Sequence, residues 1–243
     1  MTKLILDDSR EFIFPLLLVD GDSKAVTLES YVFLGTGFFV TKRGDAITAR
    51  HVIPRPEDIP PGKCLVALVR QDGKDIACLI TRSMQFHSYD LAIFHVNLPV
   101  TRFLEVTDGD VIGGMDVQLI GIPSHERRGA GKEMRLLKGH VTFVSDELEL
   151  NIAVPKGMSG CPVFVGTRVV GWATGYARSE EIVEQREEIV EVTEAKERIE
   201  ISTTSRIIYY GTAIAFARLR GQAWAEFEGK TLMQLIQSRN TGD

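Results

Sequence analysis

The sequence of 243 residues is poor in cysteine, and its three cysteines form no Cys-x-x-Cys pair. Cys64, Cys78 and Cys161 are an odd number and widely spaced, whereas a secreted protein of this size more often carries an even set that forms disulfides. Within the N-terminal 20 residues, an apolar stretch of only about seven residues follows the acidic Asp7, Asp8 and Glu11, whereas a secretion signal has a basic start and a longer apolar core. We therefore expect a cytoplasmic protein.

An excess of basic charge and long apolar runs are also lacking. The formal net charge is -5 at pH 7, so no basic surface is expected and nucleic acid is excluded as a partner. No run approaches the roughly 20 apolar residues that a membrane-spanning helix needs, so we expect no membrane partner. With 44% hydrophobic and 25% charged residues, the composition is that of an ordinary globular protein.

The acidic charge is concentrated in one stretch. Residues 180–200 contain nine glutamates but only three basic residues. The surrounding residues 178–206 contain neither glycine nor proline, and the segments EEIVEV and ERIEIS alternate apolar and charged residues on either side of TEAK. This alternation predicts a protruding β-hairpin. The alternative interpretation is a solvated charged excursion.

Short apolar segments separated by turn residues dominate the first 215 residues. Many short strands at such spacing predict an all-β protein with antiparallel barrels or sandwiches, not a fold of alternating strands and helices. The expected strands are Phe12–Val19, Tyr31–Thr41, Ala46–Ala49, Cys64–Arg70, Ile76–Arg82, Leu91–Val96, Val117–Gly121, Met134–Val144, Leu148–Ala153, Cys161–Val165, Arg168–Thr174 and Ile207–Ala217.

Residues 97–115 form a natural join between two lobes of similar size. After the last strand, the apolar pattern of Gln222–Gln237 is broadly helical and predicts a closing helix. The expected parts are an N-terminal β lobe at 1–100, a linker at 101–115, a C-terminal β lobe at 116–218 that includes the acidic stretch 178–206, and a helix with tail at 219–243.

Three segments carry residues that suit nucleophilic catalysis. A serine hydroxyl becomes a good nucleophile only when a base takes its proton, and that base must be oriented by an acceptor. Ser159 lies between two glycines in PKGMSGCPVF, His51 ends a strand in TARHVI, and Asp90 precedes the apolar strand of SYDLAIFHV. Taken singly, each residue has an ordinary alternative: Ser159 as a turn serine, His51 as a surface or core histidine, and Asp90 as a turn cap.

The glycines beside Ser159 add a further element of such a site. Gly157 and Gly160 allow the backbone to turn tightly. The N–H groups of Gly157 and Ser159 could then point at one oxygen, which is what stabilisation of a tetrahedral oxyanion requires.

The segments GTGFFVTKRGDAITARHVI, SYDLAIFHV and PKGMSGCPVF, in this order, resemble the His, Asp and Ser segments of chymotrypsin- and trypsin-like serine proteases. The resemblance is greatest to compact bacterial trypsin-like domains, such as the protease part of Deg-type enzymes, and it covers about residues 12–218. It implies two six-stranded antiparallel β-barrels with the active site in the crevice between them. It implies no cofactor and no metal.

The resemblance also implies a role for each candidate residue. His51 would be the general base and then the acid, Asp90 its orienting carboxylate, and Ser159 the nucleophile that forms an acyl-enzyme. The amides of Gly157 and Ser159 would form the oxyanion hole.

Substrate-binding residues follow from the same resemblance. VVGWATG resembles the strand that pairs with substrate backbone and YYGTAIAF the strand behind the specificity pocket, which assigns Thr174, Gly175 and Gly211 to substrate binding. Ala153, six residues before Ser159, stands at the pocket floor, where alanine favours a small or apolar P1 residue and disfavours arginine. The acidic stretch favours a basic substrate instead, so specificity stays open at this point.

Met158 departs from the pattern of secreted trypsins, in which an aspartate before the serine pairs with a newly cut N-terminus. No Ile-Val-Gly-Gly start exists here either. Either the protein folds active, or a loop or a partner completes the site. We expect a serine endopeptidase acting on a specific protein or peptide, with a regulatory protein as a further partner. The alternatives are a catalytically silent or latent trypsin-like binding module and a small-ester hydrolase.

Two other patterns predict no function. The segment GAGK at residues 129–132 lacks the first glycine and the final Ser/Thr of a phosphate-binding loop. His87 and His95 flank Asp90 at spacings compatible with a metal, yet on an alternating strand they need not converge. Cys161 is expected to point into the barrel as a small apolar residue.

Overall fold

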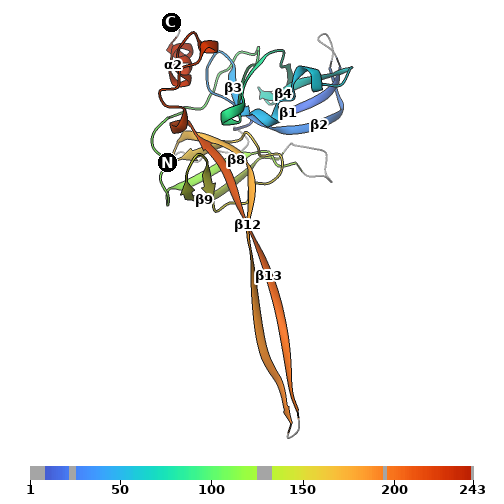
Figure 1. Ribbon diagram of the computed structural model, residues 1–243. Helices are drawn as coiled ribbons and strands as arrows, with labels where there is room; N and C mark the ends of the chain where they lie inside the picture. Colours follow the sequence, from blue (N-terminus) through green and yellow to red (C-terminus); the bar gives the residue numbers. More distant parts are fainter. Residues whose placement is uncertain (1–8, 22–25, 125–132, 194–195, 242–243) are drawn as a thin grey trace.

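The structure is a computed structural model that describes residues 9–21, 26–124, 133–193 and 196–241, with the backbone alone described for 176–193 and 196–209. Two β lobes lie against each other, and a long two-stranded ribbon projects from the second (Figure 1). The GAGK segment at residues 129–132 lies outside the described residues.

The first lobe is a seven-stranded sheet in the order β5-β4-β1-β2-β3-β7-β6, and its neighbouring strands are antiparallel. Short 3-10 turns connect several of these strands. The strands are β1 Ile13–Gly21, β2 Val26–Phe39, β3 Asp45–Ala49, β4 Lys63–Gln71, β5 Lys74–Leu79, β6 Ser83–Phe86 and β7 Leu91–His95, and the turns are η1 Arg50–Val52, η2 Pro56–Asp58 and η3 His87–Tyr89.

The second lobe is a closed six-stranded barrel in the order β10-β13-β12-β11-β8-β9. Beyond the barrel, β12 and β13 continue as a hairpin whose pairing extends to Thr193 and Lys196. The strands are β8 Asp116–Gly121, β9 Arg135–Val144, β10 Leu148–Leu150, β11 Pro162–Val165, β12 Arg168–Thr193 and β13 Lys196–Ala215.

These two lobes confirm the predicted all-β, chymotrypsin-like fold class, and the second lobe is the expected six-stranded barrel. The first lobe differs from the expected six-stranded barrel in two ways: it is a half-barrel sheet, and it has seven strands. The expected strand Ile76–Arg82 ends at Leu79 and continues as β6. The reason is a change of partner: the Ile80 amide still donates to the Leu65 carbonyl (2.9 Å), whereas Ser83 already pairs with Phe94 on β7. The chain turns a corner here, which adds a seventh strand.

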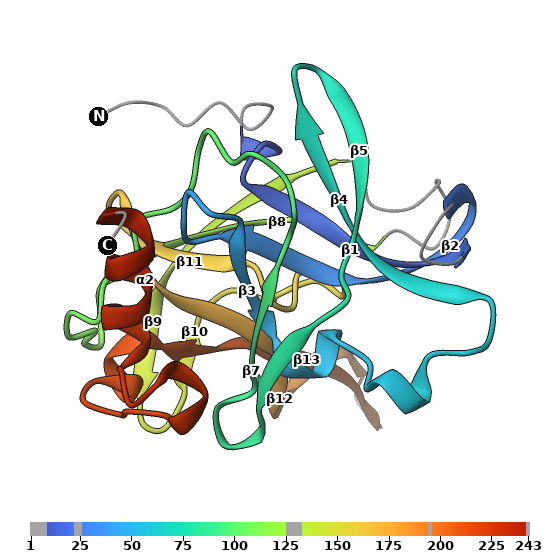
Figure 2. The same ribbon diagram turned by 90° about the horizontal axis from the view of Figure 1, so that it is seen from above.

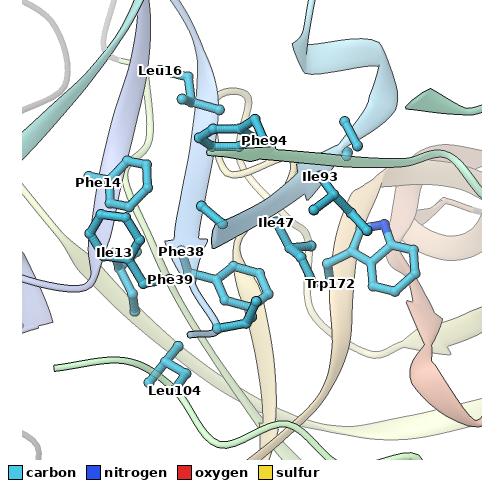
Figure 3. Close-up of a cluster of buried hydrophobic side chains, with 14 of the residues drawn as sticks. Ile13, Phe14, Leu16, Phe38, Phe39, Ile47, Ile93, Phe94, Leu104 and Trp172 are labelled. Carbon is cyan, nitrogen blue, oxygen red and sulfur yellow. The ribbon is translucent and has the colours of Figure 1, made fainter. Parts of the chain in front are cut away.

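A single apolar core joins the two lobes (Figure 3). Aromatic residues of the first lobe pack closely, with the rings of Phe14 and Phe39 4.7 Å apart between centroids. Trp172 on β12 is completely buried in the same cluster, and its ring lies 5.2 Å from that of Phe216. Burial of such large side chains is the main stabilising contribution to the contact between lobes.

The closing helix α2 spans Leu232–Thr241, so it begins later than the predicted Gln222–Gln237. Glu228 and Gly229 have left-handed backbone angles (φ +56° and +77°), which interrupt a right-handed helix. Before them the chain forms only the short turns η4 Phe216–Leu219 and η5 Ala225–Phe227.

Helix α2 packs on the first lobe although it follows the second (Figures 1 and 2). Leu232 and Ile236 are buried in the core that joins the two lobes, and Asn240 of α2 donates to the Val40 carbonyl of the first lobe (3.2 Å). The C-terminal segment thereby connects the end of the second lobe to the surface of the first. Among the described residues, no helix has the length and apolar character needed to span a membrane.

Candidate active site

His51 and Asp90 meet at the end of one strand pair. β3 and β7 are antiparallel with Ala49 opposite Leu91, so the residues just after β3 lie beside those just before β7. His51 Nδ1 lies 2.8 Å from Asp90 Oδ2, and the His51 backbone N–H donates to Asp90 Oδ1 at 3.0 Å. The carboxylate therefore holds both the ring and the backbone of the histidine.

This contact decides which imidazole nitrogen is available as a base. A carboxylate only accepts hydrogen bonds, so Nδ1 of His51 carries the proton and donates it to Asp90. In the neutral ring Nε2 then keeps a lone pair, and the imidazole side chain is 41% exposed. An imidazole held in this tautomer can take a proton from a neighbouring hydroxyl.

Asp90 is held from several sides. Its backbone is left-handed (φ +45°), a conformation that aspartate adopts more readily than most residues. Its carbonyl accepts hydrogen bonds from the Arg50 amide (2.9 Å) and the Trp172 indole N–H (3.1 Å). Arg50 Nε also lies 3.8 Å from Asp90 Oδ1. Sequence reasoning missed Arg50 and Trp172, because neither belongs to a motif that names a partner.

Ser159 lies in a tight turn made by its flanking glycines. Gly157 and Gly160 have φ of +92° and +83°, in the left-handed region that favours glycine. A β-carbon at Gly160 would collide with Thr48 Oγ1 and the Thr36 carbonyl, and one at Gly157 would lie 2.5 Å from the Phe33 ring. Both positions therefore require glycine for conformation and for space.

Two buried threonines of the first lobe hold this turn. The Thr36 N–H donates to the Ser159 carbonyl (2.9 Å), and Thr36 Oγ1 donates to the Gly157 carbonyl (3.0 Å). Thr48 Oγ1 in turn donates to the Thr36 carbonyl (2.7 Å). Sequence reasoning missed both residues, although a polar residue within a fully buried strand is a signal for such an anchor.

Two backbone amides of this turn, those of Gly157 and Ser159, are candidates for binding an oxyanion. Within the part of the chain that the structure describes, the N–H groups of Gly157 and Ser159 make no hydrogen bond, whereas those of Met158 and Gly160 do. Two neighbouring free donors on one turn can bind an oxyanion.

The Ser159 hydroxyl donates to the Thr174 carbonyl at 3.4 Å. Among the hydrogen bonds of the described residues, none links Ser159 to His51. Hydrogen bonds between catalytic groups are often long without substrate and tighten when the reacting complex forms. The arrangement therefore brings Asp90 and His51 together and leaves the Ser159 hydroxyl turned towards β12.

Met158 anchors the turn in the second lobe. Its side chain is completely buried in the apolar cluster of that barrel, which also contains Cys161. Burial raises the pKa of the Cys161 thiol far above its ordinary value, so this thiol stays protonated beside Ser159. As predicted, Cys161 acts as a small apolar residue.

The predicted substrate-binding residues lie on three neighbouring segments. Gly175 is opposite Thr212, and Gly211 is opposite Leu150, so β12, β13 and β10 run side by side. A β-carbon at Gly211 would lie 2.6 Å from Val154 Cγ2, which brings the segment containing exposed Ala153 against β13. Their role in binding stays a prediction.

Thr174 and Thr212 add a polar element to this wall. Their hydroxyl oxygens lie 2.9 Å apart, and both residues are half-buried.

His87 and His95 line a cavity of about 970 Å³ in the first lobe, and this cavity does not include Ser159 or His51 among its lining residues. His95 Nδ1 is 3.4 Å from Asp45 Oδ1. Arg239 of α2 also pairs with Asp45. Among the described residues, no cluster of His, Cys, Asp and Glu could hold a metal ion.

Comparison with known protein families identifies one domain type. A sequence model of the trypsin-like peptidase domain matches residues 35–171, more than half of the chain. No curated protein matches significantly.

Two solved structures share the fold. The active form of the Rv3671c protease from M. tuberculosis is similar with a TM-score of 0.57 and 15% identity, over 89% of this chain and 81% of that one. The HtrA-type protease AlgW, solved with a decapeptide, is similar with a TM-score of 0.54 and 14% identity, over 96% of this chain and 66% of that one. At these identities the likeness concerns the fold alone.

Proposed function

Because the chain belongs to the family of trypsin-like peptidase domains, we propose that it is a serine endopeptidase whose catalytic residues are His51, Asp90 and Ser159. The observation that carries the proposal is the pair formed by His51 and Asp90, 2.8 Å apart, on the lobe that also anchors the Ser159 turn. The amides of Gly157 and Ser159, which donate to no acceptor within the described residues, would add the anion-binding element.

The proposed reaction follows from these groups. His51 Nε2 takes the proton of the Ser159 hydroxyl as its oxygen attacks the substrate carbonyl, and Asp90 stabilises the imidazolium that forms. The Gly157 and Ser159 amides bind the tetrahedral oxyanion, each contributing about 3 kcal/mol to transition-state stabilisation. His51 then gives its proton to the leaving amine, and water hydrolyses the acyl-enzyme by the reverse sequence of proton transfers.

Labelling with a fluorophosphonate probe tests the proposal. We expect covalent labelling of the wild-type protein at Ser159, because this probe reacts with serines that a base activates. The Ser159→Ala variant is expected to lose the label. Ser145→Ala, which changes an exposed serine of the β9–β10 turn, should keep it. A well-folded wild-type protein that takes up no label would contradict the proposal.

A second candidate is a latent or silent trypsin-like module that needs a partner to act. The observation that favours it is the Ser159 hydroxyl, which donates to the Thr174 carbonyl and not to His51. Labelling that occurs only after a partner is added would favour this latent form. Hydrolysis of casein, compared with that of small esters, separates an endopeptidase from an esterase on the same fold.

The exposed Ala153 at the proposed pocket floor predicts the P1 preference. With no carboxylate there, we expect a peptide library to be cleaved mainly after small or apolar residues, because a buried guanidinium would lack a partner. Ala153→Asp is expected to raise kcat/KM for arginine at P1 by roughly tenfold or more. A wild-type profile dominated by cleavage after arginine would refute the assignment of Ala153.

The remaining parts of the proposal concern setting and partners. We propose a protein or peptide substrate, a regulatory protein as a further partner, and no cofactor, metal, nucleic acid or membrane. The scarcity and spacing of cysteines favour the cytoplasm.

A further inference from the structure

The outer part of the β12–β13 hairpin is a two-stranded ribbon that we call the arm, formed by Glu181–Thr193 and Lys196–Ile207. At about 3.3 Å per residue it extends for roughly 40 Å, well beyond the barrel (Figure 1). No other strand in the described part of the chain pairs with it. A lone two-stranded ribbon has no second layer with which to bury either face.

The pairing register assigns every paired residue of the arm to one of two faces. Residues directly opposite each other share a face, and successive residues of β13 alternate between faces. Val190 is the extra, unpaired residue of a bulge on β12. Beyond this bulge the faces are assigned from β13, so Glu191 shares a face with its partner Arg198. One face consists of Glu181, Val183, Gln185, Glu187, Ile189 and Val192 with Ile207, Ser205, Thr203, Ile201, Ile199 and Glu197, and the other of Ile182, Glu184, Arg186, Glu188, Glu191 and Thr193 with Arg206, Thr204, Ser202, Glu200, Arg198 and Lys196.

The two faces differ in chemistry. The first, which we call the acidic-aliphatic face, has six aliphatic residues, three glutamates and no basic residue. The second has one aliphatic residue, four glutamates and four basic residues, so its charges balance. On this second face Glu191 is directly opposite Arg198 in the strand register. The net negative charge and most of the apolar character of the arm thus fall on the same face.

This combination identifies the kind of molecule that fits the face. Burial of aliphatic residues against apolar groups of a binding partner is favourable, because it removes apolar surface from water. A second copy of the arm would bring glutamates against glutamates with no basic residue to compensate, which is unfavourable. We propose that the acidic-aliphatic face docks a basic protein segment in which lysine or arginine alternates with aliphatic residues. This docking surface is separate from the proposed catalytic residues and does not depend on catalysis.

A direct binding measurement tests the docking surface. The protein is the full chain carrying Ser159→Ala, so that peptide cleavage does not enter. The probe is a fluorescein-labelled 12-residue peptide of alternating lysine and valine, followed by fluorescence anisotropy. We expect saturable binding that weakens as NaCl is raised. Peptides alternating lysine with serine, or glutamate with valine, should bind at least tenfold more weakly, because each lacks one half of the complementarity.

A matched pair of triple variants locates the site. Glu181→Gln, Glu187→Gln and Glu197→Gln together remove the charge of the acidic-aliphatic face and are expected to raise Kd roughly tenfold. Glu184→Gln, Glu188→Gln and Glu200→Gln change the total charge equally on the other face and are expected to change Kd less than about twofold. Circular dichroism checks that both triple variants keep the strand content of the parent.

Three outcomes would overturn the proposal. One is no saturable binding of the lysine-valine peptide, and another is an equal loss of affinity in the two triple variants, which would indicate attraction by overall charge alone. The third is a dimer of the unliganded chain in sedimentation velocity that the first triple variant alters, since the face would then bind a second copy. Fluorophosphonate labelling of Ser159 is a separate measurement, so failure of the docking proposal and failure of the proposed enzyme are distinguishable.

Discussion

Replacing His51 with alanine is expected to lower kcat for peptide hydrolysis by about 10⁶-fold, the scale seen when the base of a serine triad is removed. The reason is that His51 is the residue positioned by Asp90, through contacts of 2.8 Å to its ring and 3.0 Å to its backbone. The rate of cleavage of a denatured protein such as casein, measured on purified variants of matched concentration, provides the test.

The first lobe contains a natural control for this substitution. His95 also contacts an aspartate, Asp45, and this pair lies at the opposite end of the same two strands, β3 and β7. His95→Ala therefore removes an equivalent side chain and ion-pair contact away from Ser159. We expect it to change kcat by less than about twofold. If both alanine variants lost activity equally, the proposed role of His51 would be wrong and a general effect on the lobe would explain the loss.

Replacing Met158 with aspartate is expected to have the largest effect on stability. Met158 is completely buried among apolar side chains of the second barrel. A carboxylate there would lose its hydration without gaining a partner, which costs roughly 3–5 kcal/mol in the free energy of unfolding. For a chain of this size the expected fall in Tm is about 10 °C. Thermal unfolding followed by circular dichroism measures it.

Met158→Leu is the matched control, because leucine keeps the apolar character and nearly the volume of methionine. Its expected cost is below about 1.5 kcal/mol. An aspartate variant as stable as the wild type would show that a cationic group reaches the position. The turn would then resemble that of secreted trypsins, and our account of Met158 would be incorrect.

The burial of Met158 bears on how the proposed site is assembled. In secreted trypsins an ion pair with a new N-terminus holds the residue before the serine. Here an apolar side chain holds the same position within the barrel core, and the Thr36 hydroxyl and amide hold the backbone on either side. Both kinds of contact exist in the uncut chain. This favours a site that assembles on folding, with the orientation of the Ser159 hydroxyl as the remaining variable.

Much of the architecture could be predicted because its causes are local. Alternation of apolar and polar residues, together with turn residues such as those at 42–45, predicts most strands of both lobes. The kink after Leu79 and the late start of α2 could not be predicted in the same way. The first depends on a change of strand partner from β4 to β7, and the second on left-handed angles at Glu228 and Gly229.

By itself the sequence determined the all-β class, the segments that carry His51, Asp90 and Ser159, and the need for glycine beside the serine. These follow from neighbouring residues, whose spacing along the chain is visible directly. Only the tertiary structure decided which polar atoms meet across the lobes: Thr36 with Gly157, 121 residues apart, and Trp172 with Asp90, 82 residues apart. Such contacts depend on how the two lobes pack against each other. The pattern of apolar and polar residues within one segment does not identify the residue that it contacts in the other lobe.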